Sequence, residues 1–324
     1  MSEALLEVRD LEVGLDRRRG VPIVRQVSFD VAPGEAVGIV GETGSGKTLS
    51  MLAVMGLLPP TVRRTGGQIR FEGLDLGALR PRELRRLRGR ELAMVYQDPA
   101  TSLNPLMTIG DQIEEALSAH GVRRAQARPR VHEALAQVGI PDPERTARAY
   151  PHQFSGGMRQ RAMIATALVL SPKLLIADEP TTALDVTIQQ QILALVRRLQ
   201  DETGMAIVWI THDLGVVARL VDRVVVMYAG HVVEQAPTRE LFRRPQHPYT
   251  AGLLASLPNP LDPSRPPLAQ IAGTPPDATQ APAGCPFHDR CPQAIERCVS
   301  ERPPLTARAG GSTAACWVPP GEWR

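Results

Sequence analysis

The sequence predicts an α/β protein with a mainly parallel core sheet. Two patterns lead to this prediction: apolar segments of strand length alternate with helical segments, and a glycine-rich loop joins one such strand to a helix. A run of strand-like segments over residues 5–40 adds an antiparallel β subdomain at the start. The chain has 324 residues, which is enough for a full core and two domains.

Composition and charge argue against several classes of protein. An apolar content of 43% fits a globular protein, and a net charge of +3 gives no reason to expect a nucleic-acid partner. Residues 1–10 do not resemble a secretory signal. The longest uncharged apolar run has 15 residues, 48–62, and a membrane-spanning helix needs about 20. Any role at a membrane is therefore expected to come through a partner.

The N-terminal region is expected to be β-rich. Apolar segments at 5–13 and 21–31 are separated by a turn at 17–20, and Pro33-Gly34 forms a second turn. A short buried strand at 36–40 then leads into the glycine-rich loop. The apolar helix after that loop is expected to end at Pro59-Pro60.

The middle of the chain alternates between strands and helices. An arginine-rich helix over residues 80–90 is expected to have a solvated face. Residues 98–170 have the pattern of a helical subdomain, with helices near 110–119 and 130–138 and another after residue 157. Further strands are expected at 68–71, 92–96, 174–178, 206–210 and 224–228, the last forming a hairpin with 232–233.

The composition changes after residue 250. Residues 251–324 contain 14 of the 30 prolines and all four cysteines, and their hydrophobic periodicity is poor. We therefore divide the chain into a domain at 1–250 and a small irregular C-terminal extension at 251–324.

Residues 41–48 match the phosphate-binding P-loop pattern G-x-x-x-x-G-K-[ST]. Backbone N–H groups in such a loop, and the start of the helix after it, bind phosphate. We expect Lys47 to reach the terminal phosphates and the Thr48 hydroxyl to face Mg²⁺. The predicted nucleotide-binding residues of this loop are Gly41, Glu42, Thr43, Gly44, Ser45, Gly46, Lys47 and Thr48.

Three polar residues follow apolar strands in the positions that a nucleotide site requires. Asp178 ends one strand and supplies a second ligand for the metal, while the adjacent Glu179 can orient or deprotonate a water molecule. His212 ends the next strand, where ligands bind in open α/β sheets. Paired carboxylates can simply be solvated and a single histidine is often structural, but the P-loop favours a functional interpretation of all three.

Six motifs in order resemble those of ABC-transporter ATPases. They are the P-loop at 41–48, a Q-loop at Gln97, the signature Ser155-Gly156-Gly157-Met158, the Walker B strand at 174–179, a D-loop at Ala183-Leu184-Asp185 and an H-switch at His212. The resemblance covers nearly all of residues 1–250 and implies an ABC ATPase fold of the P-loop NTPase class, with a helical subdomain at about 98–170. It also implies ATP hydrolysis coupled to transmembrane transport, the activity of a translocase.

Finer features resemble the ATP-binding subunits of dipeptide and oligopeptide permeases. These features are Gln97-Asp98-Pro99 with Thr101–Pro105, His152–Met158, His247–Thr250, Gly284–Phe287 and Arg290-Cys291-Pro292. The resemblance implies a subunit held peripherally at the cytoplasmic face of the inner or cell membrane by two transmembrane permease subunits. A second ABC ATPase subunit, homologous or identical, and indirectly an extracytoplasmic solute-binding protein complete the expected assembly.

The family implies a mechanism in which two ATPase subunits face each other head to tail. Each ATP lies between the P-loop of one subunit and Ser155, Gly156, Gly157 and Met158 of the other, with Asp185 contributing from the D-loop. Glu179 carries hydrolysis and His212 steadies the γ-phosphate. Gln97, which with Thr48 and Asp178 belongs to the Mg²⁺ site, links that site to the helical segment that contacts the permease in relatives.

Two positions depart from the pattern of many ABC proteins. Met158 replaces the more common Gln, as in the peptide-permease variant. Leu15 stands where relatives place an aromatic residue that stacks on adenine, and no aromatic residue precedes Phe29. Because stacking on an aromatic ring is worth about 1–3 kcal/mol per base, we expect weaker or less base-selective ATP binding.

The cysteines Cys285, Cys291, Cys298 and Cys316 follow the spacing C-x5-C-x6-C-x17-C, which fits neither a zinc ribbon nor the usual ferredoxin pattern. A reducing compartment disfavours disulfides, so four thiols in a segment without its own core suggest a metal centre. The resemblance to peptide-permease subunits favours a structural [4Fe–4S] cluster over Zn²⁺.

Other functions share part of this pattern. Importers of nickel, glutathione or other small solutes have similar ATPase subunits. Soluble ABC proteins of DNA repair or translation usually carry a long coiled-coil insertion or two cassettes, whereas only 107 residues separate Thr48 from Ser155 here. An iron–sulfur binding module with secondary ATPase activity is a third reading, and the complete catalytic motifs argue against it.

Overall fold

The computed structural model describes residues 4–16, 22–182, 184–257, 270–277 and 282–323. The chain forms two compact units, which are described separately. The first comprises Met1–Ala32, Ala36–Gly77 and Trp209–Arg324, and the second comprises Pro33–Glu35 and Ala78–Val208.

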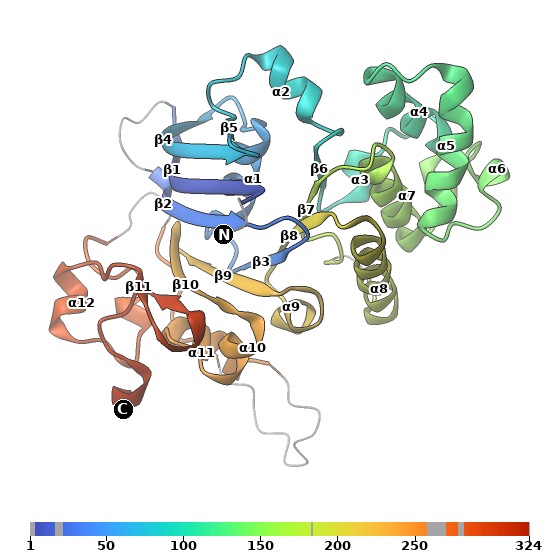
Figure 1. The fold of residues 1–324 in the computed structure, drawn as a ribbon. Helices are drawn as coiled ribbons and strands as arrows, with labels where there is room; N and C mark the ends of the chain where they lie inside the picture. Colours follow the sequence, from blue (N-terminus) through green and yellow to red (C-terminus); the bar gives the residue numbers. More distant parts are fainter. Residues whose placement is uncertain (1–3, 17–21, 183, 258–269, 278–281, 324) are drawn as a thin grey trace. The chain divides into compact units, whose positions relative to one another are not determined.

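The first unit contains a four-stranded antiparallel sheet, as the β-rich N-terminal region predicts. Its strands, in the order β2-β1-β4-β5, are β1 (Leu6–Leu15), β2 (Pro22–Val31), β4 (Val62–Phe71) and β5 (Leu74–Asp75) (Figure 1). β1 lies between β2 and β4, and Leu6 is paired with Val31 on one side and Phe71 on the other. The predicted turn at 17–20 and the first residue of the predicted strand at 21–31 lie outside the described residues.

The same unit also contains the strand that precedes the P-loop. β3 (Ala36–Val40) is buried along its whole length and runs parallel to β9 (Arg223–Tyr228), in keeping with its continuous apolar sequence. β9 forms the predicted hairpin with β10 (His231–Pro237). The surrounding elements are α1 (Lys47–Met55), α9 (Leu214–Leu220), α10 (Thr238–Arg243), α11 (Pro248–Ala255), β11 (Thr306–Ala307) and β12 (Thr313–Ala314).

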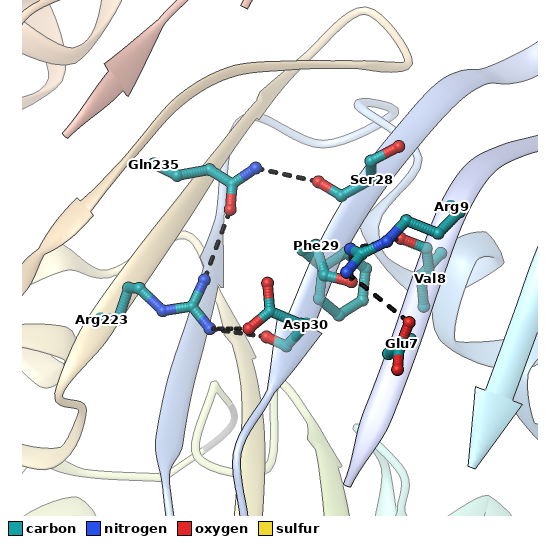
Figure 2. A network of polar contacts seen from close by, with 8 residues as sticks. All are labelled: Glu7, Val8, Arg9, Ser28, Phe29, Asp30, Arg223 and Gln235. Atoms are coloured by element: carbon teal, nitrogen blue, oxygen red, sulfur yellow. Dashed lines mark hydrogen bonds and ion pairs between the residues drawn. The ribbon is translucent and has the colours of Figure 1, made fainter. Parts of the chain in front are cut away.

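Polar side chains connect the two sheets of the first unit (Figure 2). Arg223 on β9 donates to the Asp30 backbone oxygen at 2.6 Å and to its carboxylate at 3.4 Å. Gln235 on β10 donates to the Ser28 backbone oxygen at 2.9 Å. These bonds satisfy backbone carbonyls of β2 and fix that strand against the hairpin of β9 and β10.

The second unit contains the predicted helical subdomain and two parallel strands. β6 (Leu92–Val95) pairs in parallel with β7 (Leu174–Asp178). α4, α5 and α7 pack against one another (Figure 1). The helices are α2 (Pro81–Leu87), α3 (Pro99–Ser102), α4 (Ile109–Ala119), α5 (Arg124–Gln137), α6 (Pro143–Thr146), α7 (Gly156–Leu168) and α8 (Val186–Thr203), and β8 (Ala206–Thr211) is divided between the two units.

Two helix boundaries differ from the sequence-based expectation. α1 ends before Gly56, not at Pro59-Pro60, because Gly56 adopts a left-handed conformation (φ 61°) and its N–H caps the Ala53 and Leu52 carbonyls. α5 begins at Arg124, several residues earlier than expected, and has Pro129 in its interior. The arginine-rich α2 has no buried residue, which confirms its solvated face.

In the part of the C-terminal extension that the structure describes, the helices and strands are short. Besides β11 and β12 it contains α12 (Glu296–Ser300) and the single turns η2 (His288–Arg290), η3 (Ala309–Gly311) and η4 (Pro320–Glu322). β12 pairs with β10, and Phe287 is buried against Tyr228 and Tyr249. α11 runs across the boundary that we place at residue 250. None of the helices in the described ranges has the length and apolar character to cross a membrane.

Candidate nucleotide site

The P-loop joins the end of β3 to the start of α1, so the predicted strand, loop and helix are confirmed. Glycine is required at its first position: Gly41 has φ 154°, and a Cβ there would lie 2.1 Å from the Met227 backbone oxygen. Gly46 caps α1 in a left-handed conformation with φ 96°. A glycine cap supplies no side-chain oxygen to the first helical N–H groups, an arrangement that suits a bound anion.

The P-loop lysine lies within its own loop. Lys47 is only 5% exposed, and its ammonium group donates to the Gly41 oxygen at 2.7 Å and the Glu42 oxygen at 3.0 Å. Ser45 Oγ is buried and has no hydrogen-bond partner among the described residues. A buried hydroxyl without a partner is rare in folded proteins and fits a loop that is complete only with a ligand. Thr43, Gly44 and Thr48 are exposed.

His212 belongs to the same unit as the P-loop. It directly follows β8 and is exposed, as expected for a residue at the end of a buried strand. The next residue, Asp213, caps α9 by accepting from the Gly215 N–H at 2.8 Å, and its own N–H donates to Thr211 Oγ1 at 2.9 Å. This turn fixes the backbone on the C-terminal side of His212.

In the second unit, the parallel strands β6 and β7 bring Gln97 and Glu179 together. Gln97 Nε2 donates to Glu179 Oε2 at 3.3 Å, and Thr182 Oγ1 donates to the same oxygen at 3.0 Å. Asp178, the last residue of β7, is 5% exposed. Glu179 adopts a left-handed backbone (φ 46°), a strained conformation for a non-glycine residue that is common at functional sites.

The signature residues lie at the start of α7, beside the start of α8. Ser155 caps α7, and its Oγ accepts from the Met158 N–H at 3.3 Å. Asp185 caps α8 by accepting from the Ile188 N–H at 2.9 Å. Gly157 permits the close approach of the two helices, because a Cβ there would lie 2.8 Å from Ile188 Cγ2. Gly156 lies within the same first turn of α7, whereas Ala183 of the D-loop is outside the described residues.

The four cysteines of the extension are free thiols. Burial, together with the other three thiols, raises the pKa of Cys285 to about 12. Burial likewise raises the pKa of Cys291 to about 11 and, above its ordinary value, that of Cys316. Within the described ranges, no group of three or more Cys, His, Asp or Glu residues is arranged to hold a metal ion. The arrangement of these side chains therefore does not support the predicted iron–sulfur or zinc centre.

Sequence reasoning missed the residues that support the P-loop from far along the chain. Tyr249 Oη accepts from the Glu42 N–H at 3.0 Å, and Arg290 donates to the Glu42 carboxylate. Both residues fall in segments that we singled out only for their resemblance to peptide-permease subunits. Their spacing from the P-loop, 207 and 248 residues, carries no local signal.

Comparison with protein families agrees with this fold and site. The family model described as "ABC transporter" matches residues 24–182, which include the P-loop, the signature and the two carboxylates. The model described as "Oligopeptide/dipeptide transporter, C-terminal region" matches residues 233–298. The chain belongs to the ABC transporter family, and it is an ATPase. Within that family it groups with the ATP-binding subunits of dipeptide and oligopeptide permeases, as the following relatives show.

Two curated relatives match almost the whole chain. The dipeptide transport ATP-binding protein DppD of Bacillus subtilis is 49% identical over 98% of this chain and 95% of its own length. The oligopeptide transport ATP-binding protein OppD of Salmonella typhimurium is 47% identical over 99% of this chain and 96% of its own length. A solved structure of the dimeric ATP-binding cassette MJ0796 in a post-hydrolysis state with ADP and Pi has a TM-score of 0.64 and 27% identity, covering 72% of this chain and 99% of that one. These matches confirm the family resemblance found in the sequence motifs.

Proposed function

We propose that this chain is the ATP-hydrolysing subunit of a membrane importer of di- and oligopeptides. The observation that carries the proposal is the presence in one chain of both regions: an ABC cassette and the C-terminal region of oligopeptide/dipeptide transporters. Identities of 47–49% to the DppD and OppD proteins, over nearly the full length, support the same substrate class.

The P-loop binds the ATP phosphates in this proposal. Its backbone N–H groups and the Lys47 ammonium contact the β- and γ-phosphates, and the buried Ser45 hydroxyl supplies a further polar contact. Thr48, Asp178 and Gln97 are the residues that would hold Mg²⁺. Bound there, the ion would neutralise charge on the phosphate oxygens. The orphaned Ser45 Oγ is the feature of the structure that fits a loop completed by nucleotide.

Glu179 is the proposed general base. Its carboxylate accepts from Gln97 and Thr182 through the same oxygen, which fixes the orientation of the group, as a proton acceptor requires. Deprotonation of water by Glu179 generates the nucleophile for the γ-phosphate, and His212 contacts that phosphate. Gln97 lies two residues after the end of β6 and just before α3, so it joins the Glu179 carboxylate to the start of the helical subdomain.

A second ATPase subunit, homologous or identical, completes the site. Ser155, Gly156, Gly157 and Met158 at the start of α7 provide backbone N–H groups and a hydroxyl suited to the γ-phosphate of an ATP on the opposing subunit. Asp185, at the adjacent start of α8, contributes from the same place. The dimeric state of the MJ0796 cassette supports this arrangement.

A groove in the helical subdomain is the proposed docking site for a permease helix. It has a volume of about 600 Å³ and is lined by residues on both sides of Gln97 in the chain, which include Tyr96, Leu103 and Met163. Tyr96 is 39% exposed, an apolar surface that a partner would cover. Two permease subunits would hold this chain peripherally at the cytoplasmic face of the membrane, and the solute-binding protein would act on the other side.

Transport by the reconstituted complex tests the function. Proteoliposomes are prepared with this chain, a second ATPase, the permeases and the solute-binding protein. They should transport a labelled dipeptide or oligopeptide only when ATP is present on the side of the membrane where the ATPase subunits lie. Uptake of Ni²⁺ or glutathione in place of peptides would contradict the peptide assignment and favour one of the sister systems. ATP-dependent binding to DNA or ribosomes without transport would favour a soluble ABC protein.

We also propose that the four cysteines hold a metal centre, a [4Fe–4S] cluster in preference to Zn²⁺. Its support is the location of four free thiols in one segment and the match of residues 233–298 to the C-terminal region of oligopeptide/dipeptide transporters; the side chains as placed do not form a metal-binding group. The ATPase mechanism proposed above contains no step through this group. Stoichiometric iron and visible absorbance after anaerobic purification would support the cluster. A colourless protein loaded with zinc, or one without metal, would reject it.

A further inference from the structure

The second residue of the P-loop forms an ion pair with the C-terminal extension. The Glu42 carboxylate accepts from two nitrogens of the Arg290 guanidinium, at 2.8 and 3.1 Å. The Arg290 side chain is 7% exposed and that of Glu42 is 26% exposed. This bidentate, largely buried geometry distinguishes the pair from surface salt bridges, which contribute little.

Every N–H group of the Arg290 guanidinium has an acceptor. Besides Glu42, it donates to the Ala272 oxygen at 2.9 Å, the Tyr228 hydroxyl at 3.1 Å and the Ile271 oxygen at 3.3 Å. Arginine has five N–H donors, and these contacts use all five. The guanidinium also lies 5.7 Å from the centre of the Tyr228 ring. Burial would lower the pKa of Arg290, but hydrogen bonds to Glu42 and Tyr228 raise it, so the group stays charged.

The main chain of Glu42 is fixed as well. Its N–H donates to Tyr249 Oη at 3.0 Å, and the Tyr249 and Tyr228 rings are packed with centroids 4.6 Å apart. Its carbonyl oxygen accepts from the Lys47 ammonium at 3.0 Å. Glu42 therefore contacts both Arg290, through its carboxylate, and the lysine of the phosphate-binding loop, through its carbonyl oxygen.

A carboxylate at this point in the loop opposes nucleotide binding unless its charge is compensated. It would repel the phosphates and compete with them for Lys47. We propose that Arg290 is a positioning residue for ATP: by pairing with Glu42 it neutralises this carboxylate and keeps it from Lys47, so that the C-terminal extension sets the nucleotide affinity of the P-loop. This inference rests on the proposed role of residues 41–48 in binding ATP.

The test is an equilibrium titration of the full-length chain with a fluorescent ATP analogue and Mg²⁺. Arg290→Ala should weaken binding about tenfold, because a partly buried carboxylate is left unpaired next to the phosphates. The double variant Glu42→Gln/Arg290→Ala has no such charge and should return to within about threefold of the wild type. In the assembled transporter, Arg290→Ala should raise the KM for ATP and leave kcat unchanged.

Arg297→Ala is the matched control. Arg297 lies in the same extension, where it pairs with Glu301 at 2.8 Å and lies 3.5 Å from the centre of the Trp317 ring, and it should not affect ATP affinity. Wild-type affinity in Arg290→Ala, or a double variant as weak as Arg290→Ala, would overturn the inference. If Arg290→Ala does not fold, Arg290→Lys, which keeps the charge but not the five-donor fork, should bind between about two- and fivefold more weakly, and unchanged affinity would again overturn the inference. Absence of ATP binding in the wild type would instead refute the proposed function.

Discussion

Glu179 carries an unusual combination of features at the scale of single residues. It has a left-handed backbone, it follows a buried strand, and one carboxylate oxygen accepts two hydrogen bonds from Gln97 and Thr182. Strain of this kind persists only where the surrounding structure enforces it. The carboxylate is thereby presented in a fixed orientation, as a general base requires.

Replacement of this carboxylate tests its role. Glu179→Gln should bind ATP within about twofold of the wild type and lose at least about 100-fold in turnover, because an amide cannot accept the proton of the attacking water. Binding and phosphate release are measured on the assembled transporter. Glu202→Gln, a change at an exposed carboxylate of α8 that pairs with Arg198, serves as control. Near-normal turnover in Glu179→Gln would remove Glu179 from the proposed role.

Leu15 permits a second test at this scale. It lies partly exposed at the end of β1, in the same unit as the P-loop, and it offers no ring for an adenine base. Leu15→Tyr should tighten ATP binding about tenfold and increase the preference for ATP over GTP, because base stacking on an aromatic ring is worth about 1–3 kcal/mol. Leu74→Tyr, on exposed β5 of the same sheet, is the control. Titrations with both nucleotides that show no change would contradict the expectation for Leu15.

Sequence motifs could predict those candidate residues whose chemistry is set by near neighbours in the chain. The P-loop is contiguous, and the caps formed by Ser155 and Asp185 are local. Arg290 and Tyr249 could not be assigned in this way, since their P-loop partner is more than 200 residues distant and their contacts arise only from tertiary packing. The missing partner of Ser45 Oγ is likewise visible only in the folded chain.

At the scale of elements, hydrophobic patterns predicted well those strands that are short, apolar and buried. β3, β7 and β8 fall where expected, since each is buried along its whole length. The end of α1 was mistaken because two signals compete: Pro59 marks a clear stop, but Gly56 adopts the left-handed capping conformation three residues earlier. β11 and β12, with two residues each, have no periodicity from which they could be predicted.

β10 contains a buried acid that connects it to α11. Glu234 is fully buried, and its carboxylate accepts the N–H groups of Gln246 and His247 at 2.8 and 2.9 Å. Burial raises the pKa of Glu234 from 4.5 to about 7. Between pH 4.5 and about 7 the folded state therefore keeps a proton on Glu234 that the unfolded chain has lost. The contribution of Glu234 to the free energy of unfolding falls as the pH rises through this range. Burial lowers the pKa of His247 and His231 from 6.5 to about 3, which gives a contribution of the opposite sign between these pH values.

The comparison of wild type with Glu234→Gln isolates this contribution. The free energy of unfolding of the wild type, relative to the variant, should decrease by up to about 3 kcal/mol from pH 4.5 to 7 and stay constant above it, because each unit of pKa shift corresponds to about 1.4 kcal/mol. Urea unfolding at several pH values measures it. The histidine contributions are common to both proteins and cancel. Parallel stability curves for the two proteins would show that Glu234 does not titrate in this window.

For the whole molecule, the order of motifs indicated an ABC cassette, and the family comparison confirmed it. The alternation of strands and helices predicted the mainly parallel α/β class because parallel strands require crossover connections. The sequence could not show how the extension is held. Phe287 packs against Tyr228 and Tyr249, and β12 adds to β10, so the extension is stabilised by residues of the cassette with which it shares no sequence pattern.

In the proposed mechanism two subunits bind each ATP jointly, through the P-loop of one and Ser155, Gly156 and Gly157 of the other. An ATP-bound structure of the transporter assembled with Glu179→Gln tests it most directly. We expect the ATP on Lys47 of this chain also to contact the signature of the second ATPase, and Ser155 to contact the ATP on that partner. An ATP contacted by one subunit alone, with the opposing signature remote in the closed state, would contradict it.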